Sequence, residues 1–271
     1  MTATTEPFGE LLRRWRTHRR RTQMDVALAA DVSTRHFSCL ETGRSAPSSE
    51  MVERLCEELE VPLRERNALH LAAGFAPAHA ERPFTDLGAA ADAVRSVLDG
   101  QVPNPAVAVN VHWDLLAANP VMAAFLAEMP PDLAEPRLNM LRATLHPRGL
   151  APRIRNLAQW RAHVLRRVRR QLDRTAAPGL ADLLAELSAY PAPAGASAAD
   201  GAPEAPAPGH LDDIAVPMRV ATDHGDLSLL YTVTVFGAAR DVTLDEIAVE
   251  TFYPADPATA ELLRALAGSA D

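Results

Sequence analysis

Apolar residues at the start of the chain recur at helical spacing in five short segments. Residues 8–15 carry them at i, i+3, i+4 and i+7, a spacing that lines one face of a helix. Thr22 is placed to cap a second helix, Gly43 to end a third and Gly74 to end a fifth. We therefore predict a compact all-α domain of five helices in residues 1–76.

A very short connection, residues 31–33, separates the second and third of these helices. Two short helices joined by a tight turn form a helix-turn-helix, whose second helix enters the major groove of DNA. Residues 10–45 hold eight Arg and four acidic residues, although the whole chain has a net charge of −8. Because phosphate binding depends on local charge, we predict that this domain binds DNA.

The pattern changes after the fifth helix. Pro77 and Pro83 indicate a linker, and a helix expected at about residues 86–98 completes a connecting segment, 77–102. The apolar stripe of that helix favours packing within the monomer. Sealing the two domains together or pairing with a second chain would also bury it.

Residues 103–271 mix strand and helix periodicity, with Asn119-Pro120 as a clear helix start. The expected strands are 107–113, 216–222, 227–236 and 247–253, and the expected helices are 120–126, 152–174, 180–189 and 257–266. This domain is therefore predicted as α+β, with an antiparallel sheet whose strands come from both ends of the domain. At 191–209, 16 of 19 residues are Ala, Pro or Gly, which predicts a mobile loop.

Composition narrows the class of protein. The 271 residues are 48% hydrophobic and 23% charged, as in ordinary globular proteins. No apolar run approaches the length of a membrane span and no signal segment opens the chain, so we expect a cytoplasmic protein. All 27 basic residues are Arg, which together with abundant Ala and Pro suggests a GC-rich bacterial genome.

Motifs of enzymes and metal sites are missing from the sequence. Two cysteines, Cys39 and Cys56, are too few for a disulfide framework. The His36-x-x-Cys39 pair is isolated, and neither a phosphate-binding loop nor a Gly-x-Ser-x-Gly elbow occurs. We therefore expect no metal, no cofactor and no enzymatic activity.

Several spaced residues resemble one class of helix-turn-helix. They are Arg16, Thr22-Gln23, Val26-Ala27, Val32-Ser33, Phe37-Ser38 and Glu41-x-Gly43-Arg44-x-x-Pro47. Over residues 8–73 the pattern resembles the Cro-repressor, or xenobiotic-response-element, type; the alternative is a five-helix bundle that contacts protein. Asp31 departs from the family, which often has Gly there, but Asp tolerates a left-handed backbone better than most residues.

The resemblance implies a set of residues that contact DNA. The set is Gln23, Ser33, Thr34, Arg35, Ser38, Cys39 and Arg44. In it Gln23 meets a phosphate, Arg44 clamps the DNA backbone, and Thr34, Arg35 and Ser38 reach base edges. Arg35 is the strongest candidate, because a guanidinium pairs bidentately with guanine. Cys39 either touches a thymine methyl group or only fills space.

The same resemblance implies an ion pair between Arg16 and Glu41 that ties the first helix to the third. A further cluster of arginines, Arg13, Arg14, Arg19, Arg20 and Arg21, precedes the second helix. Phosphate contacts and an ordinary solvated surface explain this cluster equally well.

Three segments of the second domain resemble the MmyB-like regulators: Trp113-Asp-Leu-Leu-Ala-Ala-Asn119, Leu138-Asn-Met-Leu-Arg142 and His146-Pro-Arg148. That family joins a Cro-type domain to a PAS-like domain, which implies a small, largely apolar, fatty-acid-like ligand between sheet and helices. The candidate lining residues are Leu141, Leu145, Trp160, Val164, Tyr231, Phe236, Phe252 and Tyr253. Ordinary core packing is the plainer explanation for each, although Tyr hydroxyls suit an apolar pocket.

Residues 137–174 hold eleven Arg and a single acidic residue, Asp173. A solvated face, salt bridges to the acidic remainder and an anion or DNA-backbone site are three explanations. Arg142 and Arg148 would flank the candidate pocket and could meet a ligand carboxylate.

Together these patterns predict a one-component transcriptional regulator that binds double-stranded operator DNA and responds to a small apolar ligand. A homodimer is expected, because two-fold operators mirror two-fold proteins. The competing class is a DNA-anchored scaffold whose second domain binds another protein. A closed apolar cavity would favour the sensor, and a flat domain with an exposed apolar patch would favour the scaffold.

Overall fold

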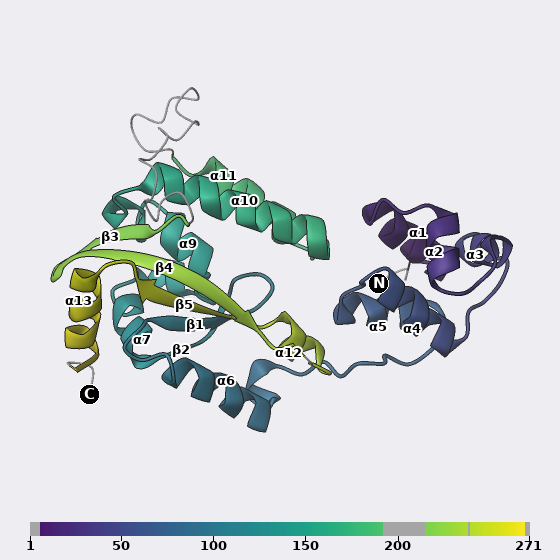
Figure 1. Cartoon of the computed structure of the whole chain (residues 1–271), viewed down its shortest axis with the longest axis horizontal. Helices are drawn as coiled ribbons and strands as arrows, with labels where there is room; N and C mark the ends of the chain where they lie inside the picture. The colour runs from purple at the N-terminus through teal and green to yellow at the C-terminus, as the bar shows by residue number, and fades with distance from the viewer. Residues whose placement is uncertain (1–5, 192–214, 238, 269–271) are drawn as a thin grey trace. The chain divides into compact units, whose positions relative to one another are not determined.

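The structure is a computed structural model that describes residues 6–191, 215–237 and 239–268. It contains two compact units, each with its own hydrophobic core (Figure 1). Of the described residues, the N-terminal unit holds 6–82 together with 239–245, and the C-terminal unit holds the rest. The domain boundaries expected from sequence, 1–76, 77–102 and 103–271, remain a prediction. In the structure, part of the linker and a segment from late in the chain go with the N-terminal unit.

The N-terminal unit contains the five predicted helices. They are α1 (Phe8–His18), α2 (Gln23–Ala29), α3 (Thr34–Glu41), α4 (Ser49–Glu58) and α5 (Leu63–Ala72). Thr22 caps α2 as predicted: its hydroxyl accepts from the Asp25 amide at 3.1 Å, and the Asp25 carboxylate accepts from the Thr22 amide at 2.9 Å. Trp15, Phe37 and Leu40 are at most 2% exposed, so their burial supplies the core that holds the helices together.

The turn between α2 and α3 depends on two local conformations. Asp31 has a φ of +53°, the left-handed backbone that the sequence allowed for. Ser33 then caps α3, with its hydroxyl accepting from the His36 amide at 3.1 Å. Gly9 lets α1 approach the end of α3, because a Cβ at that position would lie 2.4 Å from the Glu41 carbonyl oxygen.

The segment after α5 is held by a small set of contacts that we call the linker clamp, formed by Ala80, Arg82, Asp241, Val242 and Thr243. The Val242 amide donates to the Ala80 carbonyl at 2.8 Å, and Arg82 Nε lies 3.0 Å from Asp241 Oδ2. The Thr243 hydroxyl donates to the Arg82 carbonyl at 2.5 Å. Val242 is fully buried and opens the short helix α12 (Val242–Glu246). The linker clamp therefore holds residues 80–82 against the start of α12.

On its N-terminal side the same segment is tied to α5. The Asn67 side-chain amide donates to the His79 carbonyl at 2.8 Å, and its oxygen accepts from the His79 amide at 2.9 Å. Asn67 is 8% exposed, so both hydrogen bonds are shielded from water. Residues 79–82 are thus fixed to α5 at one end and to α12 at the other.

The C-terminal unit is built on one five-stranded sheet. Its strands are β1 (Ala106–Val109), β2 (Leu115–Ala118), β3 (Met218–Thr222), β4 (Gly225–Val235) and β5 (Ala248–Pro254). They lie in the order β2-β1-β5-β4-β3 and every neighbouring pair is antiparallel. This confirms the predicted α+β class, with an antiparallel sheet assembled from both ends of the domain.

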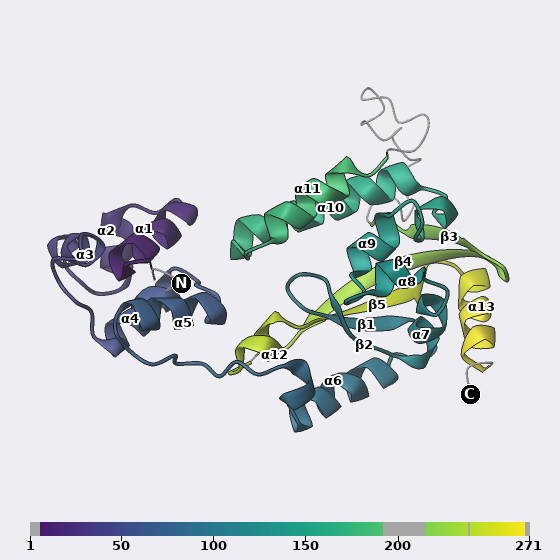
Figure 2. The same ribbon diagram turned by 180° about the vertical axis from the view of Figure 1, so that it is seen from behind.

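Helices cover both faces of the sheet (Figures 1 and 2). One face carries α6 (Ala89–Asp99), α7 (Pro120–Leu126) and α13 (Pro257–Gly268); the other carries α9 (Met140–Leu145), α10 (Leu157–Thr175) and α11 (Leu180–Ala189). The remaining helical segments are α8 (Pro131–Ala134), η1 (Phe84–Asp86) and η2 (Ala151–Arg153). The main core lies between the sheet and α9 to α11. Within the described residues no helix combines the length and apolar character needed to cross a bilayer.

Several expected elements differ in the structure. The strand expected at 107–113 ends at Val109, because the Asn110 side chain closes a turn by accepting from the amides of His112 and Asp114, each at 2.9 Å. Trp113 then adopts a φ of +69° and the chain returns as β2. The helices α8, α9 and α12 are also absent from the sequence prediction. The loop expected at 191–209 lies, apart from Pro191, outside the described residues.

Candidate DNA-contacting surface and ligand cavity

Helix α3 separates its residues into a buried and an exposed face. Phe37, Leu40 and Glu41 are buried, whereas Thr34 and Arg35 are exposed. Neither Arg35 nor the exposed Arg44 forms an ion pair within the part of the chain that the structure describes. An exposed helix with unpaired guanidinium groups has the form that major-groove readout requires.

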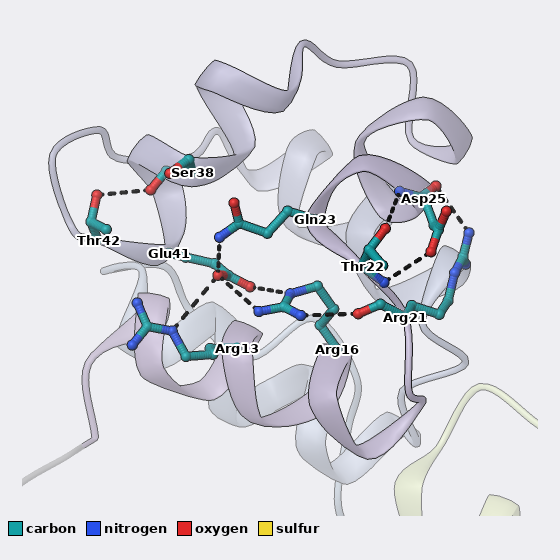
Figure 3. Close-up of polar contacts among 9 residues, drawn as sticks. All are labelled: Arg13, Arg16, Arg21, Thr22, Gln23, Asp25, Ser38, Glu41 and Thr42. Atoms are coloured by element: carbon teal, nitrogen blue, oxygen red, sulfur yellow. Dashed lines mark hydrogen bonds and ion pairs between the residues drawn. The ribbon is translucent and has the colours of Figure 1, made fainter.

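The smaller predicted contacts lie along the same helix. The Ser33 hydroxyl caps α3, and Ser38 and Cys39 are half-buried. The Thr42 hydroxyl donates to the Ser38 carbonyl at 2.8 Å, leaving the Ser38 side chain out of that contact (Figure 3). DNA contacts by Ser33, Ser38 and Cys39 remain predictions.

A buried carboxylate, that of Glu41, organises the underside of α3 (Figure 3). Arg16 contacts it through Nε at 2.6 Å and Nη2 at 3.2 Å, which confirms the implied ion pair. Gln23 Nε2 donates to the same carboxylate at 2.6 Å, and Arg13 Nε lies 3.7 Å away. The sequence did not reveal this role of Gln23. Its predicted phosphate contact remains a prediction.

Part of the arginine cluster before α2 has a structural role. Arg19 donates to the carbonyls of Leu59 and Glu60, at 2.8 and 2.7 Å, and Arg21 donates to the Glu58 carbonyl at 2.8 Å. These carbonyls lie at the C-terminal end of α4, where cations offset unpaired acceptors and the helix dipole. The solvated-surface explanation is therefore incomplete.

A cavity partly open to solvent lies between the sheet and helices α9 and α10; its enclosed volume is about 30 Å³, within about 450 Å³ of empty space that includes open solvent. Of the predicted lining residues, Leu141, Trp160, Val164, Tyr231 and Phe252 do line it. They come from α9, α10, β4 and β5, so the sheet and one of its two helical layers contribute to the wall.

Three predicted lining residues lie elsewhere. Leu145 is buried in the core and Phe236 is half-buried just beyond the end of β4; neither lines the cavity. Tyr253 is 37% exposed and its hydroxyl donates to Gln101 at 2.8 Å. It follows Phe252 in β5, and successive side chains of a strand point to opposite faces.

The cavity also has a polar end that the sequence analysis missed. Arg167 Nη1 lies 2.5 Å from Glu250 Oε1, and these side chains are 19% and 6% exposed. Burial raises the pKa of Glu250, an effect that Arg167 opposes. The one signal in the sequence was that Glu250 lies two residues before Phe252 in an apolar strand, so that both side chains point to the same face of the sheet.

Two aromatic rings and a histidine surround this ion pair. The Arg167 guanidinium carbon lies 4.2 Å from the ring centre of Trp113 and 4.8 Å from that of Tyr231. The Tyr231 hydroxyl is 2.5 Å from His163 Nε2. Burial first, and then the charge of Arg167, lower the pKa of His163, so we treat this side chain as neutral near pH 7.

The arginines expected beside the cavity are engaged in ion pairs. Arg142 contacts Glu186 through Nε and Nη2, both at 2.8 Å, and Arg148 pairs with Asp132. Neither lines the cavity, so the expectation that they meet a ligand carboxylate is corrected. Salt bridges also occupy other members of the Arg-rich segment: Arg153, Arg155 and Arg167.

Comparison with known families matches both units. Residues 7–69 match the model of a helix-turn-helix domain. Residues 90–266 match the model described as the MmyB-like transcription regulator ligand binding domain. The chain belongs to the MmyB-like transcription regulators. This MmyB-like regulator thus combines the two domains that its motifs indicated.

Individual relatives cover less of it. The transcriptional regulator ClgR of two Mycobacterium tuberculosis strains, CDC 1551 / Oshkosh and ATCC 25618 / H37Rv, is 40% identical over 58 residues. That match covers 21% of this chain and 52% of the relatives, so the chain spans about half the length of these curated proteins. An RNA-binding light-oxygen-voltage receptor structure aligns over 96% of this chain and 62% of its own, at 8% identity and a TM-score of 0.27.

Proposed function

We propose that this MmyB-like regulator reads operator DNA with α3 and that occupancy of the cavity by a small, largely apolar ligand alters DNA binding. The observation that carries the first half is the exposed, unpaired Arg35 on a helix whose opposite face is fully buried. The cavity supports the second half, because its wall is mostly apolar with few polar groups.

The linker clamp supplies a route between the two sites along the chain. Strands β4 and β5 contribute Tyr231, Glu250 and Phe252 to the cavity. The connection between these two strands carries Asp241, which holds Arg82. A ligand that shifts β4 against β5 would therefore move the linker. This works only if the ligand has different affinities for the two arrangements.

We further propose a homodimer. A single recognition helix reads few base pairs, whereas two copies related by a two-fold axis read two half-sites about one helical turn apart, roughly 34–36 Å. Footprints that are symmetric and span two such half-sites are the expected result.

Selection of bound DNA from a random pool tests the DNA-reading proposal. The wild-type chain should enrich a two-fold sequence, and Arg35→Ala should lose preference at one base pair in each half-site, worth about 1–3 kcal/mol. Arg44→Ala is the matched control: it should weaken binding to all sequences and lower the salt slope by about 1. An Arg35→Ala protein that selects the same sequence with the same preference would contradict the proposal.

A further inference from the structure

The ion pair at the polar end of the cavity limits which ligand head group fits there. Arg167 is the cation lining the cavity among the described residues, and Glu250 is the carboxylate lining it. They lie 2.5 Å apart, so each already balances the charge of the other. Since His163 is treated as neutral, the polar end carries no net charge.

Arg167 is also held in place. Its guanidinium lies between the rings of Trp113 and Tyr231, at 4.2 and 4.8 Å from their centres, where cation–π attraction favours it. Its stem comes from α10, whose neighbouring Val164 and Val168 are buried in the core. The guanidinium therefore has little freedom to leave Glu250 and follow an incoming anion.

A carboxylate entering this end would compete with Glu250 for one guanidinium. One of the two anions would be left in a poorly hydrated site without a full partner, and an uncompensated buried charge is strongly destabilising. An uncharged group avoids this cost. A hydroxyl or amide can donate to the Glu250 carboxylate and accept from a neighbouring N–H or O–H donor.

Building on the proposed ligand-sensing function, we propose that the cavity selects a neutral amphiphile, an apolar body ending in an uncharged hydroxyl or amide group, over the free carboxylic acid of the same skeleton. The apolar body lies against Leu141, Val164 and Phe252. The polar group lies at Arg167 and Glu250, whose ion pair stays intact.

Calorimetric titration of the full chain at pH 7.5 with decanol, decanamide and decanoate tests this inference. The two neutral probes are expected to bind tighter than decanoate by about tenfold or more, equivalent to about 1.4 kcal/mol. Decanoate binding as tightly as either neutral probe would overturn the inference and leave the sensor proposal intact. Failure of all three probes to bind would overturn the small-apolar-ligand proposal and this inference together.

Glu250→Gln provides an independent arm, because it removes the negative charge with little change in shape. In this variant decanoate should gain about tenfold in affinity, while decanol should change little. Glu261→Gln is the matched control: its exposed carboxylate lies on α13, on the other face of the sheet, and the order of the probes should stay as in the wild type. An unchanged decanoate affinity in a folded Glu250→Gln protein contradicts the inference. If that variant does not fold, the wild-type comparison decides alone.

Discussion

The guanidinium of Arg16 makes a two-point contact with the carboxylate of Glu41, with Nε 2.6 Å from Oε1 and Nη2 3.2 Å from Oε2. The Glu41 side chain is fully buried and that of Arg16 is 16% exposed. Because α1 carries Arg16 and α3 ends at Glu41, this contact sets the position of α3 on its domain.

Glu41→Ala is therefore expected to destabilise the N-terminal unit. Removing one partner of a buried pair costs about 3–5 kcal/mol, because the other charge is left uncompensated. Urea unfolding followed by circular dichroism measures the loss. The control is Glu50→Ala on α4, whose carboxylate is 86% exposed and lies 3.6 Å from Arg54; its cost should stay below about 0.5 kcal/mol. Equal losses in the two variants would show that the buried network does not support the domain.

The two cysteines should differ in reactivity. Burial raises the pKa of Cys56 to about 12, so at pH 8 it is protonated and unreactive toward iodoacetamide. Cys39 is half-buried on α3 and should be alkylated first. Operator DNA should slow this alkylation more than DNA of random sequence does, as read by mass spectrometry of the peptides. Alkylation of Cys39 at the same rate with and without operator would place α3 outside the DNA interface.

Acid should remove one contribution to the stability of the C-terminal unit. Hydrogen bonds from Arg142, and then from Tyr190, lower the pKa of Glu186. A lowered carboxyl pKa stabilises the fold above the unfolded-state value, about 4.3, and this contribution is lost as the pH falls through the folded-state pKa. Arg142→Gln should therefore lower the urea midpoint at pH 7, and the difference from wild type should shrink at pH 3.

The size of this effect is modest, because the Arg142 and Glu186 side chains are 41% and 38% exposed. We expect less than about 1 kcal/mol at pH 7. Arg95→Gln, which removes an exposed i,i+3 pair with Asp92, is the control and should show little difference at either pH. If the urea midpoints of Arg142→Gln and wild type differ more at pH 3 than at pH 7, the proposed role of the Glu186 carboxylate is contradicted.

The linker clamp should protect the chain after Glu81 from cleavage. Asp241→Asn weakens the contact with Arg82 Nε, now 3.0 Å, so residues 80–82 should open more often. A protease that cuts after Glu, such as V8 protease, should then release the fragment ending at Glu81 several-fold faster than from wild type. Asp92→Asn, which changes a 77% exposed carboxylate on α6, should not change this rate. Equal release from all three proteins would mean that Asp241 does not hold the linker.

The N-terminal unit was predictable because its signals are local. The Thr22–Asp25 capping box, the left-handed Asp31 and the apolar spacing of α1 each involve residues within one or two turns. The Arg16–Glu41 ion pair could also be predicted, because both residues belong to a spaced motif that resembles a known class of helix-turn-helix. The bond from Gln23 to Glu41 was not, because nothing in the local pattern distinguishes a buried amide from an exposed one.

The C-terminal unit was predictable in class but not in detail. Alternation predicted β5 to within one residue at each end, yet Tyr253 was placed in the cavity although it shares no face with Phe252. The strand predicted at 107–113 was wrong beyond Val109, because a turn closed by the Asn110 side chain interrupts the apolar run. The pairing of Arg167 with Glu250 joins α10 to β5, and contacts between distant segments leave no periodicity in either one.

The return of residues 239–245 to the N-terminal unit has a practical consequence for the design of fragments of this regulator. A single cut in the chain does not separate the two units, because a fragment that stops after Arg82 lacks Asp241, Val242 and Thr243. Chimaeras that join a foreign sensor domain to the N-terminal unit should therefore include residues 239–245 as well as the chain up to Arg82. Without them, Arg82 loses its contact with Asp241 at the junction.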